Sequence, residues 1–205
     1  MNVGTTTTVR TWYYDYGTSG DNLNMLTAVT LPDGHVWQYS QIGTLVQNND
    51  MWDGRTGANC GLHPPANGQT FSYTVTHPSG ATGSFSFINK RHPRSGIHIN
   101  MCASLGGGQY KLMMPNYFDV ESLISKTLSG PGLASQQWTY IYPLTPASLW
   151  GTRGANQPYP CADTTACPSE KVVTVNEPDG TKTDYTYGYL YASNEGRLLK
   201  TTTYD

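Results

Sequence analysis

A hairpin motif that occurs three times is the feature that most constrains how this chain folds. Residues 29–34, 75–80 and 175–180 share the pattern Val-x-x-Pro-Asp/Ser-Gly. Five residues after each glycine stands an aromatic residue, namely Tyr39, Phe85 and Tyr185. Three agreements of this kind indicate an internal repeat, in which each copy is one unit of local structure.

The chemistry of the motif predicts a tight turn. Proline fixes φ for the second position of a type I turn, and Asp or Ser suits the third position. Glycine then adopts the left-handed conformation that forms a G1 bulge. Each copy is therefore predicted to be a β-hairpin. The residues that shape these turns are Pro32, Gly34, Pro78, Gly80, Pro178 and Gly180.

The residues on both sides of each turn alternate, which is typical of strands with one buried face. The predicted inner positions before the turns are Leu23, Met25, Thr27 and Val29, then Phe71, Tyr73 and Val75, then Val173 and Val175. After the turns they are Trp37 and Tyr39, Phe85 and Phe87, and Tyr185, Tyr187 and Tyr189. Further strands are expected at 9–16, 118–128, 137–142 and 198–204, and only 120–124 tolerates a helical turn. The fold class is all-β, an antiparallel sheet of repeated hairpins.

Three stretches rich in Gly, Pro and Asn interrupt the repeats, near residues 48–68, 89–108 and 151–168. We interpret them as irregular insertions that decorate one sheet, because the repeat pattern resumes beyond them. Residues 1–205 are thus expected to form a single segment of a repeat array. Both ends lie in strand-like sequence, so we expect them to be cut edges of a longer array.

Composition excludes several partners. Charged residues make up 13% of the chain and the net charge is -2, so no basic field exists to hold a nucleic acid. No apolar run approaches the length of a membrane helix, and the start of the chain lacks the features of a signal peptide. The aromatic fraction of 12% argues against disorder.

Four cysteines have spacings that match no zinc module. Two disulfides, Cys161 with Cys167 and Cys60 with Cys102, would suit an exported protein. Four reduced thiols are the alternative, and the sequence leaves the choice open.

Short motifs at the two ends resemble the tyrosine-aspartate repeats of bacterial Rhs proteins. Tyr14-Asp15 provides one such pair, and Gly196-Arg197-Leu198 leads through a Thr-rich strand to Tyr204-Asp205. The hairpins are similar to the turn-and-strand units between such repeats. The resemblance implies a secreted or cell-surface bacterial protein, in which repeats build a β-shell around a C-terminal toxin domain. The implied partners are neighbouring repeats of the same parent chain and the enclosed toxin domain.

No residue pattern indicates an active site, a metal site or a cofactor. A glycosidase needs two carboxylates across a cleft, for which Asp50, Asp53 and Glu121 are the loop or strand candidates. Three histidines lack the spacing expected of metal ligands; they are His63, His92 and His98. We therefore expect a non-enzymatic structural protein without a cofactor.

Exposed tryptophans provide the alternative function, a carbohydrate-binding β-module. Trp52 lies among polar loop residues and Trp12 lies near the start of the chain, so either ring is a candidate for stacking on a glycan. The other tryptophans are expected to pack on the sheet.

Overall fold

The computed structural model describes residues 9–18, 20, 23–43, 70–93, 101–107, 109–114, 117–143, 151–152, 169–190 and 193–205. The predicted insertion at 48–68 and nearly all of that at 151–168 lie outside these residues. So do Trp52, Cys60, Cys161 and Cys167. The described part of the chain contains strands and turns and no α-helix, which confirms the all-β prediction.

The first strands are β1 (Tyr13–Tyr16), β2 (Leu26–Thr30), β3 (Val36–Ile42), β4 (Thr70–Thr76) and β5 (Thr82–Pro93). They are followed by β6 (Met101–Gly106), β7 (Gln109–Met114), β8 (Tyr117–Gly130) and β9 (Leu133–Ile141). The last are β10 (Gly151–Thr152), β11 (Glu170–Asn176), β12 (Lys182–Gly188) and β13 (Leu198–Tyr204).

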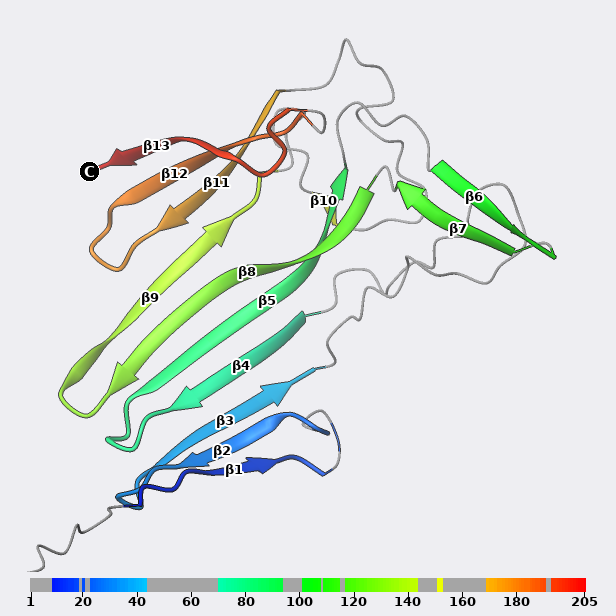
Figure 1. The fold of residues 1–205 in the computed structure, drawn as a ribbon. Coiled ribbons are helices and arrows are strands. Elements are labelled where there is room, and N and C mark those ends of the chain that lie inside the picture. The colour runs from blue at the N-terminus through cyan, green and yellow to red at the C-terminus, as the bar shows by residue number, and fades with distance from the viewer. Residues whose placement is uncertain are drawn as a thin grey trace, which may run out of the picture.

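Ten of these strands form one antiparallel meander in the order β1-β2-β3-β4-β5-β8-β9-β11-β12-β13 (Figure 1). The short strand β10 pairs with the far end of β5, and β6 and β7 form a separate hairpin that projects from the main sheet. Every extensive contact between elements joins hydrogen-bonded neighbours. Nearly all the long-range order therefore comes from strand pairing.

The three predicted turns are equivalent, as their sequences indicated. Gly34, Gly80 and Gly180 have φ values of 85°, 84° and 92°, and each N–H donates to the carbonyl three residues earlier. In each hairpin a second hydrogen bond closes the G1 bulge, for example from Glu177 N to Thr181 O at 2.9 Å. All three turns lie at the same end of the sheet (Figure 1).

A fourth hairpin, which we did not predict, joins β8 to β9 at that same end (Figure 1). Its turn contains Pro131 between Gly130 and Gly132, and Gly132 has a φ of 73°. Here glycine flanks the proline on both sides, so the Val-x-x-Pro-Asp/Ser-Gly pattern does not match. A search for any Pro-Gly turn would have found it.

Three predictions need correction. Strand β2 begins only at Leu26, because Asn24 has a left-handed φ of 61° that breaks the alternation expected from Leu23. The stretch at 89–108 is not irregular throughout, since Asn89 to Pro93 continue β5 and Met101 to Gly106 form β6. Residues 120–124, where a helical turn was tolerated, lie within β8.

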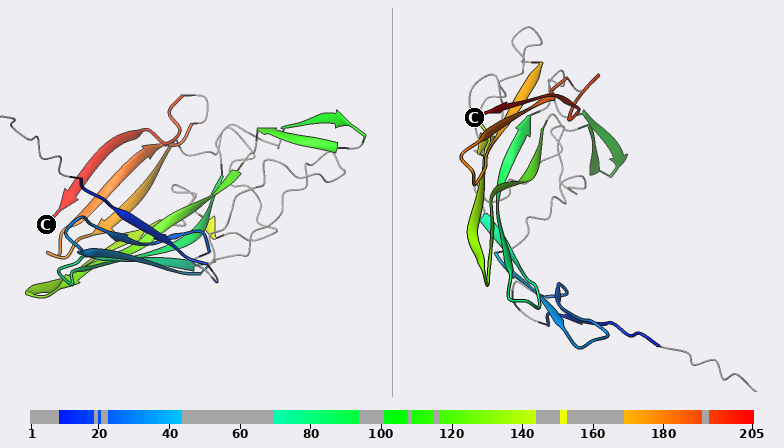
Figure 2. Two further views of the ribbon diagram at one scale, coloured as in Figure 1. Left: turned by 60° about the horizontal axis from the view of Figure 1, so that its bottom comes forward. Right: turned by 90° about the vertical axis from the view of Figure 1, so that its left-hand side faces the viewer.

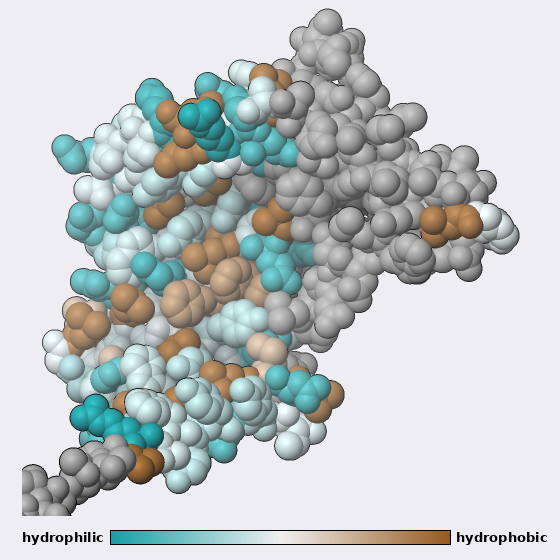
Figure 3. Space-filling model, in the orientation of Figure 1, coloured by the Kyte–Doolittle hydropathy of each residue, from teal (hydrophilic) through white to brown (hydrophobic). Residues whose placement is uncertain are grey.

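The register gives the main sheet two chemically different faces. Cross-strand partners share a face, and one face, called here the aromatic face, carries Trp37, Tyr39, Phe71, Tyr73, Phe85, Phe87, Trp138, Tyr140, Tyr185 and Tyr187. The opposite face, the Ser/Thr face, carries mainly hydroxyl residues, among them Ser40, Ser72, Thr74, Ser84, Ser125, Thr139, Thr174 and Thr186. Apolar side chains gather over the middle strands of the sheet, with polar ones around them (Figure 3).

The sheet is a single curved layer (Figure 2). Among the described residues the buried apolar side chains are few: Phe71, Val175 and Tyr189. Phe71 stacks on Phe87 with ring centroids 4.9 Å apart, and both rings meet Tyr73 edge to face. Globular domains normally bury the apolar side of a sheet against a second layer, and no described element supplies one here.

Candidate functional site

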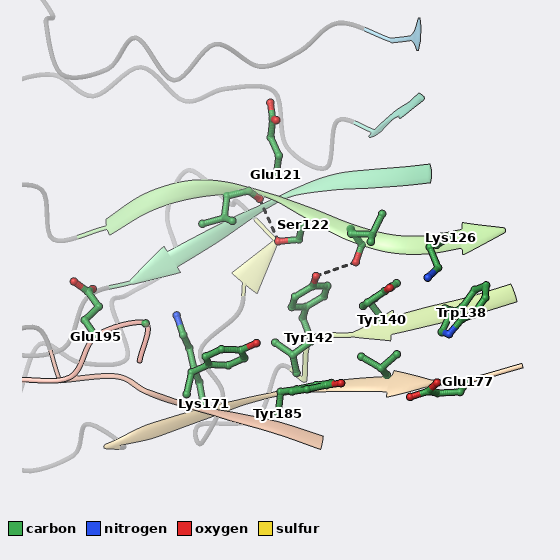
Figure 4. Close-up of a pocket in the computed structure, with 16 residues that line it drawn as sticks. Glu121, Ser122, Lys126, Trp138, Tyr140, Tyr142, Lys171, Glu177, Tyr185 and Glu195 are labelled. Carbon is green, nitrogen blue, oxygen red and sulfur yellow. Dashed lines mark hydrogen bonds between the residues drawn. The ribbon is translucent and has the colours of Figure 1, made fainter. Parts of the chain in front are cut away.

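A cavity of about 880 Å³ opens where β8 and β9 separate. The pairing of β9 with β8 ends at Ser125 and Thr139, whereas β8 continues beside β5 as far as Tyr117. From Thr139 onward, β9 pairs with β11 on its other side. The space left between β8 and the β9–β11–β12 strands is the cavity (Figure 4).

Aromatic rings on alternate positions line the middle of this cavity. Tyr140 lies on β9, Tyr142 follows it, and Tyr185 lies on β12 (Figure 4). Tyr187, also on β12, completes the set. The Tyr142 hydroxyl donates to the Leu123 carbonyl at 2.9 Å, which ties β9 to β8 across the gap. Burial raises the pKa of Tyr142 to about 12, so this phenol stays protonated and keeps donating.

One end of the cavity holds a buried lysine. Lys171 on β11 is 3% exposed and lies opposite Tyr187 on β12, with its ammonium 5.4 Å from the centre of the Tyr189 ring. Burial lowers the pKa of Lys171 to about 8, although the carboxylate of Glu195 acts in the opposite direction. Desolvation therefore outweighs the attraction of the neighbouring carboxylate.

The other end of the cavity also carries charged side chains, Lys126 and Glu177. Lys126 places its ammonium 3.6 Å from the centre of the Trp138 ring, its cross-strand partner. Glu177 accepts a hydrogen bond from the Thr183 hydroxyl at 3.4 Å. Glu177 and Glu195 line opposite ends of the cavity, and Glu121 points away from the tyrosines (Figure 4).

The residues predicted to form sites do not meet in this cavity. Trp12 is 47% exposed and precedes β1, at the outer edge of the sheet farthest from β13 in strand order. Glu121 lies on β8, while Asp50 and Asp53 are outside the described residues, as are His63 and His98. Cys102 lies in β6, but its predicted partner Cys60 is outside the described part. Within that part, no three His, Cys, Asp or Glu residues are grouped so that they could hold a metal ion.

Sequence reasoning missed the cavity, although it predicted that four of the lining residues, Val173, Val175, Tyr185 and Tyr187, share one face. The alternation that placed Val173 and Val175 with the tyrosines of β12 extends one step back to Lys171, which puts a lysine on an aromatic face. A charged residue in an aromatic row of a strand was the sequence signal that could have pointed to the cavity. The point at which β9 stops pairing with β8 depends on strand register, and no local sequence pattern predicts it.

No family model, curated protein or solved structure matches the chain. Within its described part, the chain has no helix of the length and apolarity needed to cross a membrane.

Proposed function

We propose that this chain is a non-enzymatic wall segment of an Rhs-type repeat protein, where it contributes strands to an enclosing or surface β-shell. In the parent protein such a shell would carry a toxin domain. The observation that carries the proposal is the single-layer meander of equivalent hairpins, with one aromatic face and one Ser/Thr face. A wall requires these features, because its two sides meet different surroundings and its strands continue into neighbouring repeats.

The edges of the sheet support the same proposal. Among the described strands, β1 pairs only with β2 and β13 pairs only with β12. Both outer strands carry exposed apolar residues, including Tyr13, Tyr14, Leu198 and Leu199. In a shell segment, such edge strands pair with the strands of the neighbouring repeats.

Association of the 205-residue chain tests the proposal. We expect light scattering to show concentration-dependent assembly through the edges, with slower amide exchange in β1 and β13 as the concentration rises. A Thr202→Lys change adds a charge to β13 and should weaken the assembly. Thr74→Lys is the matched control, because it adds the same charge to the Ser/Thr face of central strand β4.

A strictly monomeric chain at high concentration, with a sharp cooperative melt, would contradict the shell proposal. Equal weakening by Thr202→Lys and Thr74→Lys would also contradict it, since the association would then not depend on an edge.

A carbohydrate-binding module is the second candidate, and the exposure of Trp12 favours it. Tyr14, two positions further along the chain, is also exposed, so a glycan could stack on Trp12 together with Tyr14. Binding on a glycan array that disappears in Trp12→Ala, while Trp37→Ala retains it, would support this function. Absence of glycan binding in the unmodified chain would exclude it.

A further inference from the structure

The middle of the cavity has a floor and two walls that the strand register explains. On β11, Val173 and Val175 lie on the aromatic face of the sheet, where the neighbouring strands carry tyrosines. Tyr140 of β9 is the cross-strand partner of Val175, and Tyr185 of β12 is the partner of Val173. Two small side chains between larger rings form a groove, and all of these residues line the cavity.

The walls of this groove also carry hydroxyl groups that lie near one another. Burial raises the pKa of Tyr140, and Tyr185 and Glu177 add to this effect. Burial is also the main cause of the raised pKa of Tyr142, to which Tyr140 and Tyr187 contribute. A protonated phenol both donates and accepts hydrogen bonds. The groove therefore offers ring surface to an apolar body and phenols to polar groups at its margin.

The charges along the cavity are mixed at both ends. One end carries Lys171 and Glu195, whose carboxylate acts on that lysine, and the other end carries Lys126 and Glu177. Glu121, the remaining charged residue of the described lining, points away from the tyrosines (Figure 4). Beside the tyrosines the two signs are therefore equal in number. A ligand with a net charge would lose its hydration there without meeting an excess of the opposite charge.

A neutral saccharide matches this combination of rings, phenols and mixed charges. The C–H faces of a sugar ring pack on aromatic side chains. Each sugar hydroxyl donates to a carboxylate and accepts from an ammonium or a phenol, so both signs of charge are useful to it. The cavity volume of about 880 Å³ is in the range of small-molecule sites, in which a few polar groups fix the orientation of the ligand.

We propose that this cavity binds a short neutral saccharide, with one sugar ring on the two valines between Tyr140 and Tyr185 and with hydroxyl groups directed at the charged side chains of the two ends. The site is separate from Trp12, which precedes the edge strand β1. It does not rest on the shell proposal, because it needs no neighbouring repeat.

Isothermal titration of the 205-residue chain with neutral disaccharides tests the site. The probes are cellobiose, maltose, lactose and N,N′-diacetylchitobiose, and we expect at least one of them to bind. Tyr185→Ala should weaken that binding by about tenfold, because it removes one wall of the groove. Tyr39→Ala is the matched control, since Tyr39 lies on the same face in β3 and outside the described lining. It should leave the affinity unchanged.

Filling the groove provides a second test. Val173→Trp places a large ring on the floor and should weaken binding by at least about tenfold. Val172→Trp is its matched control, because Val172 pairs with Thr186 on the Ser/Thr face of the same strand pair. Circular dichroism verifies that each variant forms the sheet. In the unmodified chain, which needs no variant to fold, the saccharide should slow amide exchange in β9, β11 and β12 and leave β1 and β2 unchanged.

Charged analogues test the class of ligand. Replacing one hydroxymethyl group of the bound disaccharide with a carboxylate, or one hydroxyl with an ammonium, should weaken binding by about tenfold. The proposal is overturned if no disaccharide binds, if a charged analogue binds more tightly, or if Tyr185→Ala and Tyr39→Ala weaken binding equally. Binding that Trp12→Ala removes and Val173→Trp retains would also overturn it. None of these outcomes depends on association of the chain, which tests the shell proposal.

Discussion

At the scale of single residues, the three turn glycines share a positive φ but differ in how much space a side chain would have. Gly34 and Gly180 have positive φ values, but a Cβ at either position would meet open space. Gly80 has the same positive φ, but a Cβ there would also crowd a neighbouring side chain. It would lie 3.3 Å from Pro131 Cγ in the adjacent hairpin. The three turns are thus equivalent in backbone geometry and differ in their surroundings.

Replacing each of these glycines with valine should therefore lower the free energy of unfolding by different amounts. Gly34→Val and Gly180→Val should each lower the free energy of unfolding by about 1–2 kcal/mol, because an L side chain is strained at positive φ. Gly80→Val should cost more, since Pro131 must also shift. Urea unfolding measures the order, and Gly180→Asn should cost less than Gly180→Val because asparagine tolerates this conformation. Equal losses at all three glycines would contradict the role of Pro131.

Lys171 should make the stability of the chain depend on pH. Its pKa of about 8 lies below the ordinary 10.5, so between these values the unfolded chain binds more protons and stability rises with pH. Lys171→Met should accordingly be more stable than the parent below pH 8, by up to about 3 kcal/mol. This advantage should shrink as pH approaches 10.5 in urea unfolding series. A pH-independent difference would mean that packing, not burial of charge, distinguishes the two side chains.

At the scale of elements, the hairpins are held by rings on one face and by hydroxyl groups on the other. In the β4–β5 hairpin, Phe71 and Phe87 are cross-strand partners whose rings stack in parallel. On the other face of the same hairpin, Thr74 pairs with Ser84. The apolar contribution to stability therefore lies on the aromatic face.

Truncation on the two faces of β4 should have unequal effects. Phe71→Ala should lower the free energy of unfolding by about 3–5 kcal/mol, because Phe71 is buried and loses its stacked neighbour. Thr74→Ala should change it by less than about 0.5 kcal/mol, as a substitution away from the packed face. Thermal or urea unfolding of both variants measures the contrast. Comparable losses would indicate that the Ser/Thr face is also packed.

At the scale of the whole molecule, the centre of the sheet is held by more strand pairing than its two edges. The longest ladder joins β5 to β8, from Thr82 opposite Ser129 to Pro93 opposite Tyr117. Each edge strand has hydrogen-bonded partners on one side only in the described part of the chain. Local opening should therefore become easier from the centre outward.

Amide exchange of the dilute chain should reveal this gradient. We expect the slowest exchange in β5 and β8 and the fastest in β1 and β13. The hydrogen bonds of the edge strands can open while the central ladder stays intact. Mass spectrometry of peptide fragments reports the order. Uniform protection from β1 to β13 would contradict this gradient and show that the sheet opens as a single cooperative unit.

The sequence by itself determined the local structure of this protein. Turn glycines such as Gly34 and alternating residues such as Tyr185 and Tyr187 specify hairpins, because backbone conformation and the two-residue period of a strand are local properties. They also determined that one face would be aromatic. Even the closing strand, expected at 198–204, has those bounds.

Tertiary structure alone decided where the hairpins meet and what lies between them. The left-handed Asn24 shortens β2; asparagine tolerates this conformation but does not require it. The cavity exists because β9 leaves β8 at Ser125 and continues beside β11, and this exchange of partners joins residues more than thirty positions apart. Lys171 is buried beside Tyr187 and Tyr189, and the sequence around Lys171 does not by itself specify that a lysine is removed from water there.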